Sequence, residues 1–187
     1  EKFSEITTIC VGNIYLGGTG KTPTTIKLYE ILKELKYNVS TGKKFYKSQS
    51  DENQILQKKT ELISAGTRLE ILEFGNIDNK NCIVFDDGLQ DKTISYDIEF
   101  VCFDSKNFIG NGFLIPSGPL REKINSLKKY DGVFLKSDNE MIENQLDIIK
   151  KINPKIEIFK TYYEITNLNK FNLNDQYLIV SGIGSPE

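Results

Sequence analysis

The stretch ITTICVGNIYLGGTGKTP, residues 6–23, decides the fold. It begins with an apolar, β-branched run at residues 6–11, continues as a glycine-rich segment at residues 12–22 and reaches Pro23. The run predicts a buried strand, and proline suits the first turn of a helix because its missing N–H would have no partner there. From Pro23 to Lys36 apolar residues recur at helical spacing, so the stretch predicts a strand, a loop and an amphipathic helix.

The loop has the composition of a phosphate-binding loop. Small residues let backbone N–H groups approach an anion at the positive end of the next helix, and they stand at Gly17, Gly18, Thr19 and Gly20. Lys21 is expected to reach the β- and γ-phosphates of a nucleotide, and the Thr22 hydroxyl to ligate Mg²⁺. The loop is a variant, because Tyr15 stands where the general pattern has its first glycine. The alternative is a plain glycine-rich turn, which would not need the cation and hydroxyl of Lys21 and Thr22.

The rest of the chain alternates between apolar runs and helical candidates. Apolar runs occur at residues 82–85, 98–103, 133–135, 156–159 and 177–180, and helices are expected at residues 50–59, 120–130 and 139–152. This alternation predicts an α/β fold of the P-loop NTPase type, with a mostly parallel twisted sheet and helices on both faces. No linker or repeat interrupts it, so residues 1–187 are expected to form one nucleotide-binding core.

Two carboxylates follow the predicted strand at residues 82–85. Asp86 and Asp87 precede a glycine, at the end of the strand where open α/β sheets bind ligands. Adjacent acids repel each other unless a cation neutralises them, and a nucleotide-bound Mg²⁺ would do so. An Asp-Gly turn is the alternative, and the nearby phosphate-binding loop favours the metal, with Asp86 as its ligand. Asp51 and Glu52, by contrast, resemble only a helix cap and a first-turn charge.

The charge of the chain limits the kinds of partner that it can bind. The formal net charge of −2 gives no basic field for a nucleic acid backbone, so no nucleic acid partner is expected.

Three widely spaced cysteines lie in apolar runs, which indicates reduced core thiols in a cytoplasmic protein. No apolar stretch approaches the roughly 20 residues of a membrane-spanning helix, so the chain is expected to be soluble. Because the chain starts at Glu1 and its one methionine is Met141, we expect it to be a fragment.

Three strings together resemble the tetraacyldisaccharide 4'-kinase (lipid A 4'-kinase) family. They are residues 11–23, residues 86–90 (DDGLQ), and residues 110–112 (GNG) followed by 116–122 (PSGPLRE). The resemblance implies transfer of the ATP γ-phosphoryl group to the 4'-hydroxyl of an acylated disaccharide 1-phosphate lipid. It also implies Mg²⁺ as cofactor and work at a membrane surface, on the cytoplasmic face of the bacterial inner membrane.

The resemblance also implies roles for individual residues. Asp51 would be the base that accepts the proton of the substrate hydroxyl. Asp87, with Asp86, would orient the metal and that hydroxyl, and Lys21 would complete the catalytic set. Arg121 and Glu122 would line the nucleotide or sugar-phosphate site, although a solvated charge pair is the alternative from the residues alone.

The chain departs from the family at several positions. The family usually has a histidine where Asp91 stands, and its Ser-Arg-Gly-Tyr element is faint at residues 40–46, which makes a role for Tyr46 doubtful. The chain has no histidine, whereas the family pairs its catalytic aspartate with one from a C-terminal lobe. Residues 181–187 resemble the element that precedes this lobe, so we expect the lobe and the amino-terminal membrane anchor to be missing.

Two other functions remain open from the sequence. A partitioning-type switch ATPase has a similar loop, but it carries a lysine just before the two glycines, where this chain has Leu16. A nucleotide-binding module without transfer activity is the second alternative, which the lack of histidine keeps open.

Overall fold

The computed structural model describes residues 6–45, 50–138, 141–164, 168–172 and 176, without the side chains of residues 50–52 and 168. The elements follow one another as β1 (Thr7–Gly12), α1 (Lys21–Glu34), β2 (Val39–Lys44), α2 (Ser50–Lys59), β3 (Leu62–Ala65), α3 (Arg68–Ile77), β4 (Cys82–Asp86), β5 (Ile98–Asp104), η1 (Ile124–Lys129), β6 (Gly132–Lys136), α4 (Glu143–Ile152), β7 (Glu157–Thr161) and η2 (Leu168–Lys170). The two η elements are 3-10 helices.

The strands form one seven-stranded sheet in the order β3-β2-β4-β1-β5-β6-β7, and every strand pair in it is parallel. This confirms the predicted fold class. β1 lies at the centre, between β4 and β5, so the chain passes to one side of β1 and later returns to the other. Such a reversal of strand order places a ligand crevice outside the carboxyl ends of the central strands.

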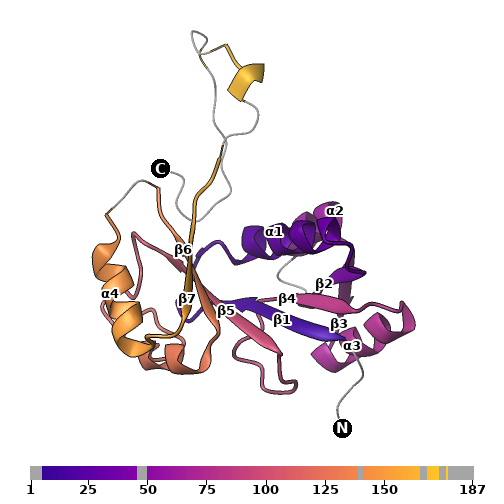
Figure 1. The fold of residues 1–187 in the computed structure, drawn as a ribbon, viewed down its shortest axis with the longest axis horizontal. Helices are drawn as coiled ribbons and strands as arrows, with labels where there is room; N and C mark the ends of the chain where they lie inside the picture. Colours follow the sequence, from indigo (N-terminus) through magenta and orange to yellow (C-terminus); the bar gives the residue numbers. More distant parts are fainter. Residues whose placement is uncertain (1–5, 46–49, 139–140, 165–167, 173–175, 177–187) are drawn as a thin grey trace.

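Helices cover both faces of the sheet, with α1 and α2 on one face and α3 and α4 on the other (Figure 1). Successive residues of a strand point to opposite faces, and both faces are buried here. On β1, Ile9 and Val11 join the apolar cluster that includes Tyr29 of α1, whereas Cys10 joins the larger cluster with Ile71 of α3. The sheet therefore lies between two apolar clusters, one on each face, and these clusters fix the positions of its strands.

The predicted elements around the glycine-rich loop are confirmed, with shifted bounds. The strand expected at residues 6–11 is β1, and the helix expected from Pro23 is α1, which begins two residues earlier at Lys21. The runs at 82–85, 98–103, 133–135 and 156–159 correspond to β4 to β7, and the run at 177–180 lies outside the described residues. Helices α2 and α4 correspond to those expected at 50–59 and 139–152.

The helix predicted at residues 120–130 is wrong. Only the 3-10 helix η1 forms in that region, and the residues before it pair with the loop after β1. Leu120 bridges Tyr15 in antiparallel fashion, and the Arg121 amide donates a hydrogen bond to the Ile14 carbonyl at 2.7 Å. These long-range backbone bonds outweigh the local helical pattern and hold Arg121 beside the glycine-rich loop.

Candidate active site

The glycine-rich loop joins β1 to α1 in a conformation that depends on its glycines. Gly17 and Gly20 have φ values of 140° and 82°, which side chains rarely adopt, and no side chain caps the start of α1. The Asn13 side chain braces the loop by donating to the Gly17 carbonyl at 3.2 Å and to the Thr19 hydroxyl at 3.0 Å. The backbone N–H groups at the start of α1 are therefore available to an anion.

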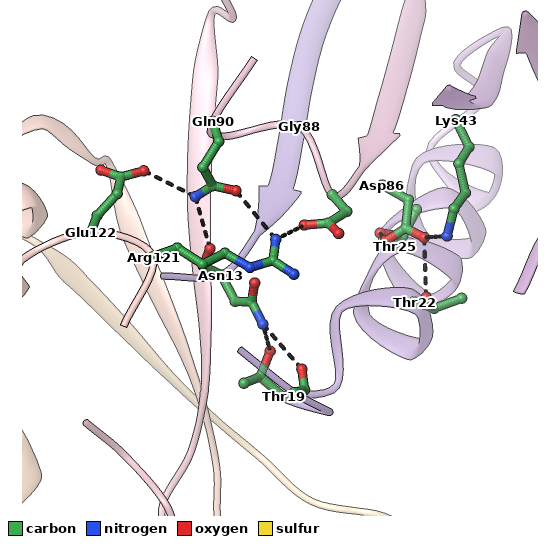
Figure 2. Close-up of polar contacts among 12 residues, drawn as sticks. Asn13, Thr19, Thr22, Thr25, Lys43, Asp86, Gly88, Gln90, Arg121 and Glu122 are labelled. Carbon is green, nitrogen blue, oxygen red and sulfur yellow. Dashed lines mark hydrogen bonds and ion pairs between the residues drawn. The ribbon is translucent and has the colours of Figure 1, made fainter. Parts of the chain in front are cut away.

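Asp86, at the end of β4, meets the start of α1 (Figure 2). Its Oδ2 accepts a hydrogen bond from the Thr22 hydroxyl at 3.1 Å and lies 2.8 Å from Lys43 Nζ, while Oδ1 lies 3.5 Å from the Thr25 hydroxyl. Both partners of the Lys43–Asp86 ion pair are buried. Burial raises the pKa of the Asp86 carboxyl, and the charges of Lys43 and Lys21 oppose that rise. The sequence places the acid 64 residues from Thr22, and the parallel sheet brings them together.

The donor atoms around Asp86 fit Mg²⁺. A carboxylate and a hydroxyl are the hard oxygen ligands that Mg²⁺ prefers, and Mg²⁺ usually takes only one or two protein carboxylates together with substrate phosphates. Within the described residues no group of three or more histidine, cysteine or acidic side chains could hold a metal alone. Thr22 and Asp86 therefore suit a metal that arrives with a nucleotide.

Asp87 lies on the other side of the strand end and is part of a second polar network. Its φ of 57° places it in the left-handed region, and its Oδ1 accepts a hydrogen bond from Arg121 Nη1 at 3.0 Å. Arg121 Nη1 also approaches Gln90 Oε1 at 3.4 Å, and Gln90 Nε2 donates to the Asn13 carbonyl at 3.0 Å and to Glu122 Oε1 at 2.9 Å (Figure 2). The network ties Asp87 and Gln90 to Asn13, at the start of the glycine-rich segment, and to Arg121 and Glu122.

Arg121 and Glu122 are neighbours in sequence, but their side chains have different partners. Arg121 faces the cavity beside Asp87, whereas Glu122 is held by Gln90, by the Tyr130 hydroxyl at 3.0 Å and by Lys129 Nζ at 3.0 Å. Burial raises the pKa of Glu122, these donors lower it, and the net change is downward. Glu122 lines neither of the two cavities described below, and its expected place in the nucleotide or sugar-phosphate site stays a prediction.

A cavity of about 560 Å³ opens between the ends of β2 and β4 and the Arg121 segment. Its walls combine carboxylates with a larger number of cations, and they are Lys43, Lys44, Arg68, Asp86, Asp87, Gln90, Asp91, Lys92, Thr93 and Arg121. The excess of cations favours a ligand that carries negative charge. Lys43, Arg68 and Asp91 were not predicted as site residues. Lys43 lies in the faint element at residues 40–46, Arg68 lies in a stretch without a motif, and Asp91 stands where the family usually has a histidine.

A second groove, of about 360 Å³, lies on the opposite side of the glycine-rich loop. Thr19 and Gly20 of the loop form one wall, β6 contributes Phe134, and the residues just after β7 contribute Tyr162 and Tyr163. Apolar and aromatic surface dominates this groove, in contrast to the charged cavity. The loop thus separates two hollows of different chemistry.

Several residues predicted to be functional cannot be placed. Asp51 and Glu52 open α2, but their side chains lie outside the described part of the chain, as do Tyr46 and residues 181–187. In the described segments, no helix combines the length and the apolar character needed to cross a membrane.

Comparison with known proteins gives consistent matches. The family model described as tetraacyldisaccharide-1-P 4'-kinase matches residues 2–72 and 46–187. The tetraacyldisaccharide 4'-kinase of Pelagibacter ubique is 47% identical over 182 residues, which are 97% of this chain and 58% of that protein. The enzyme of the same name from Rickettsia canadensis is 34% identical, covering 96% and 58% of the two chains. The chain therefore spans less than two thirds of the length of these relatives.

Solved structures match the fold. A crystal structure of LpxK from Aquifex aeolicus in complex with ATP superposes with a TM-score of 0.65 at 19% identity, over 84% of this chain and 54% of that one. The signal recognition particle 54 kDa protein of Aeropyrum pernix, in complex with GDP, gives a TM-score of 0.59 at 11% identity, over 87% and 42%. At these identities the likeness establishes the P-loop NTPase fold.

Proposed function

The chain belongs to the tetraacyldisaccharide-1-P 4'-kinase family, and we propose that it transfers the γ-phosphoryl group of ATP to the 4'-hydroxyl of a tetraacyldisaccharide 1-phosphate. The product is a bisphosphorylated precursor of lipid A. The relatives' name supplies the acceptor, and the geometry of the site supplies the reasons for phosphoryl transfer.

One observation carries the proposal: the Thr22 hydroxyl donates to the Asp86 carboxylate at 3.1 Å. This bond joins the start of the phosphate-binding helix to the acidic end of the neighbouring strand. Phosphoryl transfer depends mainly on positioning and on neutralising charge, so a phosphate cradle and a metal-binding carboxylate must share one place. A glycine-rich turn without a nucleotide would not require this convergence.

Each site residue has its own role in the proposed phosphoryl transfer. The loop at Gly17–Gly20 and Lys21 hold the β- and γ-phosphates, and Thr22 and Asp86 would hold Mg²⁺, which would neutralise charge on the phosphates. Asp87 orients the attacking hydroxyl or the metal shell, and Arg121 stabilises charge on the transferred group. Asp51 accepts the hydroxyl proton, which passes from the sugar oxygen to the carboxylate as the new P–O bond forms and the bond to the leaving ADP breaks.

We assign the two substrates to the two cavities by their chemistry. The apolar groove beside Thr19 and Gly20 suits the nucleoside of ATP, because aromatic walls favour a planar base. The charged cavity beside Asp86 and Asp87 suits the phosphorylated sugar, because its cations attract a phosphate. The γ-phosphate would lie between them, above the loop. Since the acceptor carries acyl chains, we place the reaction at a membrane surface, on the cytoplasmic face of the bacterial inner membrane, without a nucleic acid partner.

Nucleotide binding and lipid-dependent turnover test the proposal separately. We expect calorimetry to detect MgATP binding that weakens by about 100-fold or more in Lys21→Ala, because a charge-assisted contact to phosphate is lost. Lys33→Ala, which removes a half-exposed lysine of the same helix that lines neither cavity, is the matched control and should bind as the unaltered chain does.

The second arm measures transfer of labelled phosphate from ATP to tetraacyldisaccharide 1-phosphate. We expect product that depends on the added lipid and stops in Asp51→Ala, with ATP binding retained. ATP hydrolysis that ignores the lipid would favour a switch ATPase, and binding without any turnover would favour a non-catalytic nucleotide-binding module. A chain that does not bind nucleotide at all would refute the proposal.

A further inference from the structure

Arg68 and Asp91 form an ion pair in the charged cavity to which the proposed mechanism gives no role. The Arg68 side chain is 4% exposed and the Asp91 side chain 18%. Asp91 Oδ2 accepts a hydrogen bond from Arg68 Nη1, while Oδ1 accepts from the Thr93 amide at 3.0 Å and from the Thr93 hydroxyl at 2.6 Å. Because both carboxylate oxygens are bonded, Asp91 fixes the orientation of the guanidinium.

The other end of the same guanidinium reaches the backbone of Asp87. Arg68 Nη2 donates to the Asp87 carbonyl at 2.7 Å, and the Asp87 amide donates to the Val11 carbonyl at 2.8 Å. Both peptide groups of Asp87 are therefore tied, one to α3 and one to β1. This matters because Asp87 has a φ of 57°, a conformation that residues other than glycine seldom adopt without support.

The turn that follows Asp87 is tied to the same pair. The Asp91 amide donates to the Gly88 carbonyl at 3.0 Å, which closes the turn. A Cβ at Gly88 would lie 2.4 Å from the Tyr96 hydroxyl and 2.8 Å from Cys10 Sγ, so the turn packs closely against the core at these two residues. Asp91 thus belongs to the turn that it stabilises through Arg68.

We propose that Arg68 and Asp91 are positioning residues that hold Asp87 in its left-handed conformation, so that its carboxylate is set beside Arg121 before any substrate arrives. Neither side chain needs to touch a substrate, because the pair acts through the Asp87 carbonyl. The inference rests on the proposed function for its catalytic meaning, since a preset carboxylate helps only if Asp87 orients the metal or the hydroxyl.

Amide hydrogen exchange of the chain without nucleotide or metal tests the inference directly. Asp91→Asn keeps the shape of the side chain and removes the charge that holds Arg68, and we expect the Asp87 amide to exchange about tenfold faster. Asp91→Glu restores the charge and should recover part of the protection. Glu61→Gln is the matched control, because it breaks an exposed ion-paired cluster elsewhere and should leave the Asp87 amide unchanged. Wild-type exchange in both Asp91→Asn and Arg68→Lys would overturn the inference.

Nucleotide titrations distinguish a positioning role of Arg68 and Asp91 from a general loss of stability in the variants. In Asp91→Asn we expect the affinity for ATP with Mg²⁺ to fall about tenfold, and the affinity for ATP in EDTA to stay unchanged, because the glycine-rich loop alone holds the phosphates. Equal weakening under both conditions would show a structural effect and would refute positioning. If Asp91→Asn does not fold, Arg68→Lys carries the same comparison. An unaltered chain that binds no nucleotide would refute the proposed function, while the exchange experiment would still decide on Arg68 and Asp91.

Discussion

The buried ion pair between Lys43 and Asp86 gives the sharpest stability prediction. The side chains are 3% and 0% exposed, and their charged atoms lie 2.8 Å apart. Removing one partner of such a pair leaves a buried charge without that partner, which typically costs about 3–5 kcal/mol. We therefore expect Lys43→Met and Asp86→Asn each to lower the free energy of unfolding by about 3 kcal/mol or more.

The double variant Lys43→Met/Asp86→Asn should behave differently. It buries no charge, and replacing a buried pair by neutral groups is often close to neutral for stability. We expect it to lose less than either single variant, which corresponds to a coupling energy of at least about 3 kcal/mol in a double-mutant cycle. Thr22 would still find an oxygen acceptor on Asn at position 86, so the fold of the loop should persist.

Urea unfolding followed by far-UV circular dichroism measures the four free energies. A domain of this size usually has about 5–15 kcal/mol of stability, so the single variants should remain folded enough to compare. The cycle Lys33→Met/Glu61→Gln serves as control, because that pair is half-exposed and should couple by less than about 1 kcal/mol. Single variants within about 1 kcal/mol of the unaltered chain, with an additive double variant, would refute the reasoning.

Two further predictions concern titration. Hydrogen bonds from Lys33 and Lys80 lower the pKa of Glu61 from 4.5 to about 2, so its stabilising contribution is present above pH 4.5 and is lost as the pH falls towards 2. The stability difference between Glu61→Gln and the unaltered chain should stay below about 1 kcal/mol at pH 7, since the pair is exposed, and should shrink in urea titrations at lower pH. Burial raises the pKa of all three cysteine thiols, to about 11 for Cys82 and about 12 for Cys102, so iodoacetamide should label the chain at pH 8 only in denaturant. Labelling of the native chain would contradict the buried positions.

The central part of the fold could be predicted because its signals are local. The run before Gly12 and the pattern after Lys21 fix a strand, a loop and a helix within residues close in sequence. The meeting of Thr22 and Asp86 also followed, since carboxyl ends of parallel strands share one edge of the sheet. Two local motifs and one rule of topology were sufficient for this half of the site.

The strand β2 shows why the rest could not be predicted. Its sequence, Val39–Lys44, contains one large apolar residue followed by polar and small ones, which is not a strand pattern. Nevertheless Thr41 and Lys43 are buried, because Thr41 bonds the Thr60 hydroxyl at 2.6 Å and Lys43 pairs with Asp86. A polar residue can be buried only when its partner is present, and no sequence pattern identified the partners here.

The cations that the sequence did not identify as site residues bear on the chemistry of the site. Lys43 and Arg68 are buried cations, and each is stabilised by a carboxylate at or just after the end of β4. Each acid therefore comes with a cation from a neighbouring element, Asp86 with Lys43, Asp91 with Arg68, and Asp87 with Arg121. Three carboxylates within six residues would repel one another in an unpaired turn. The cations from β2, α3 and the segment before η1 remove that repulsion, and they do so without occupying the start of α1, where a phosphate must bind. The arrangement thus pairs each acid with a cation and holds it in place while it leaves the anion site open, as phosphoryl transfer at this edge of the sheet requires.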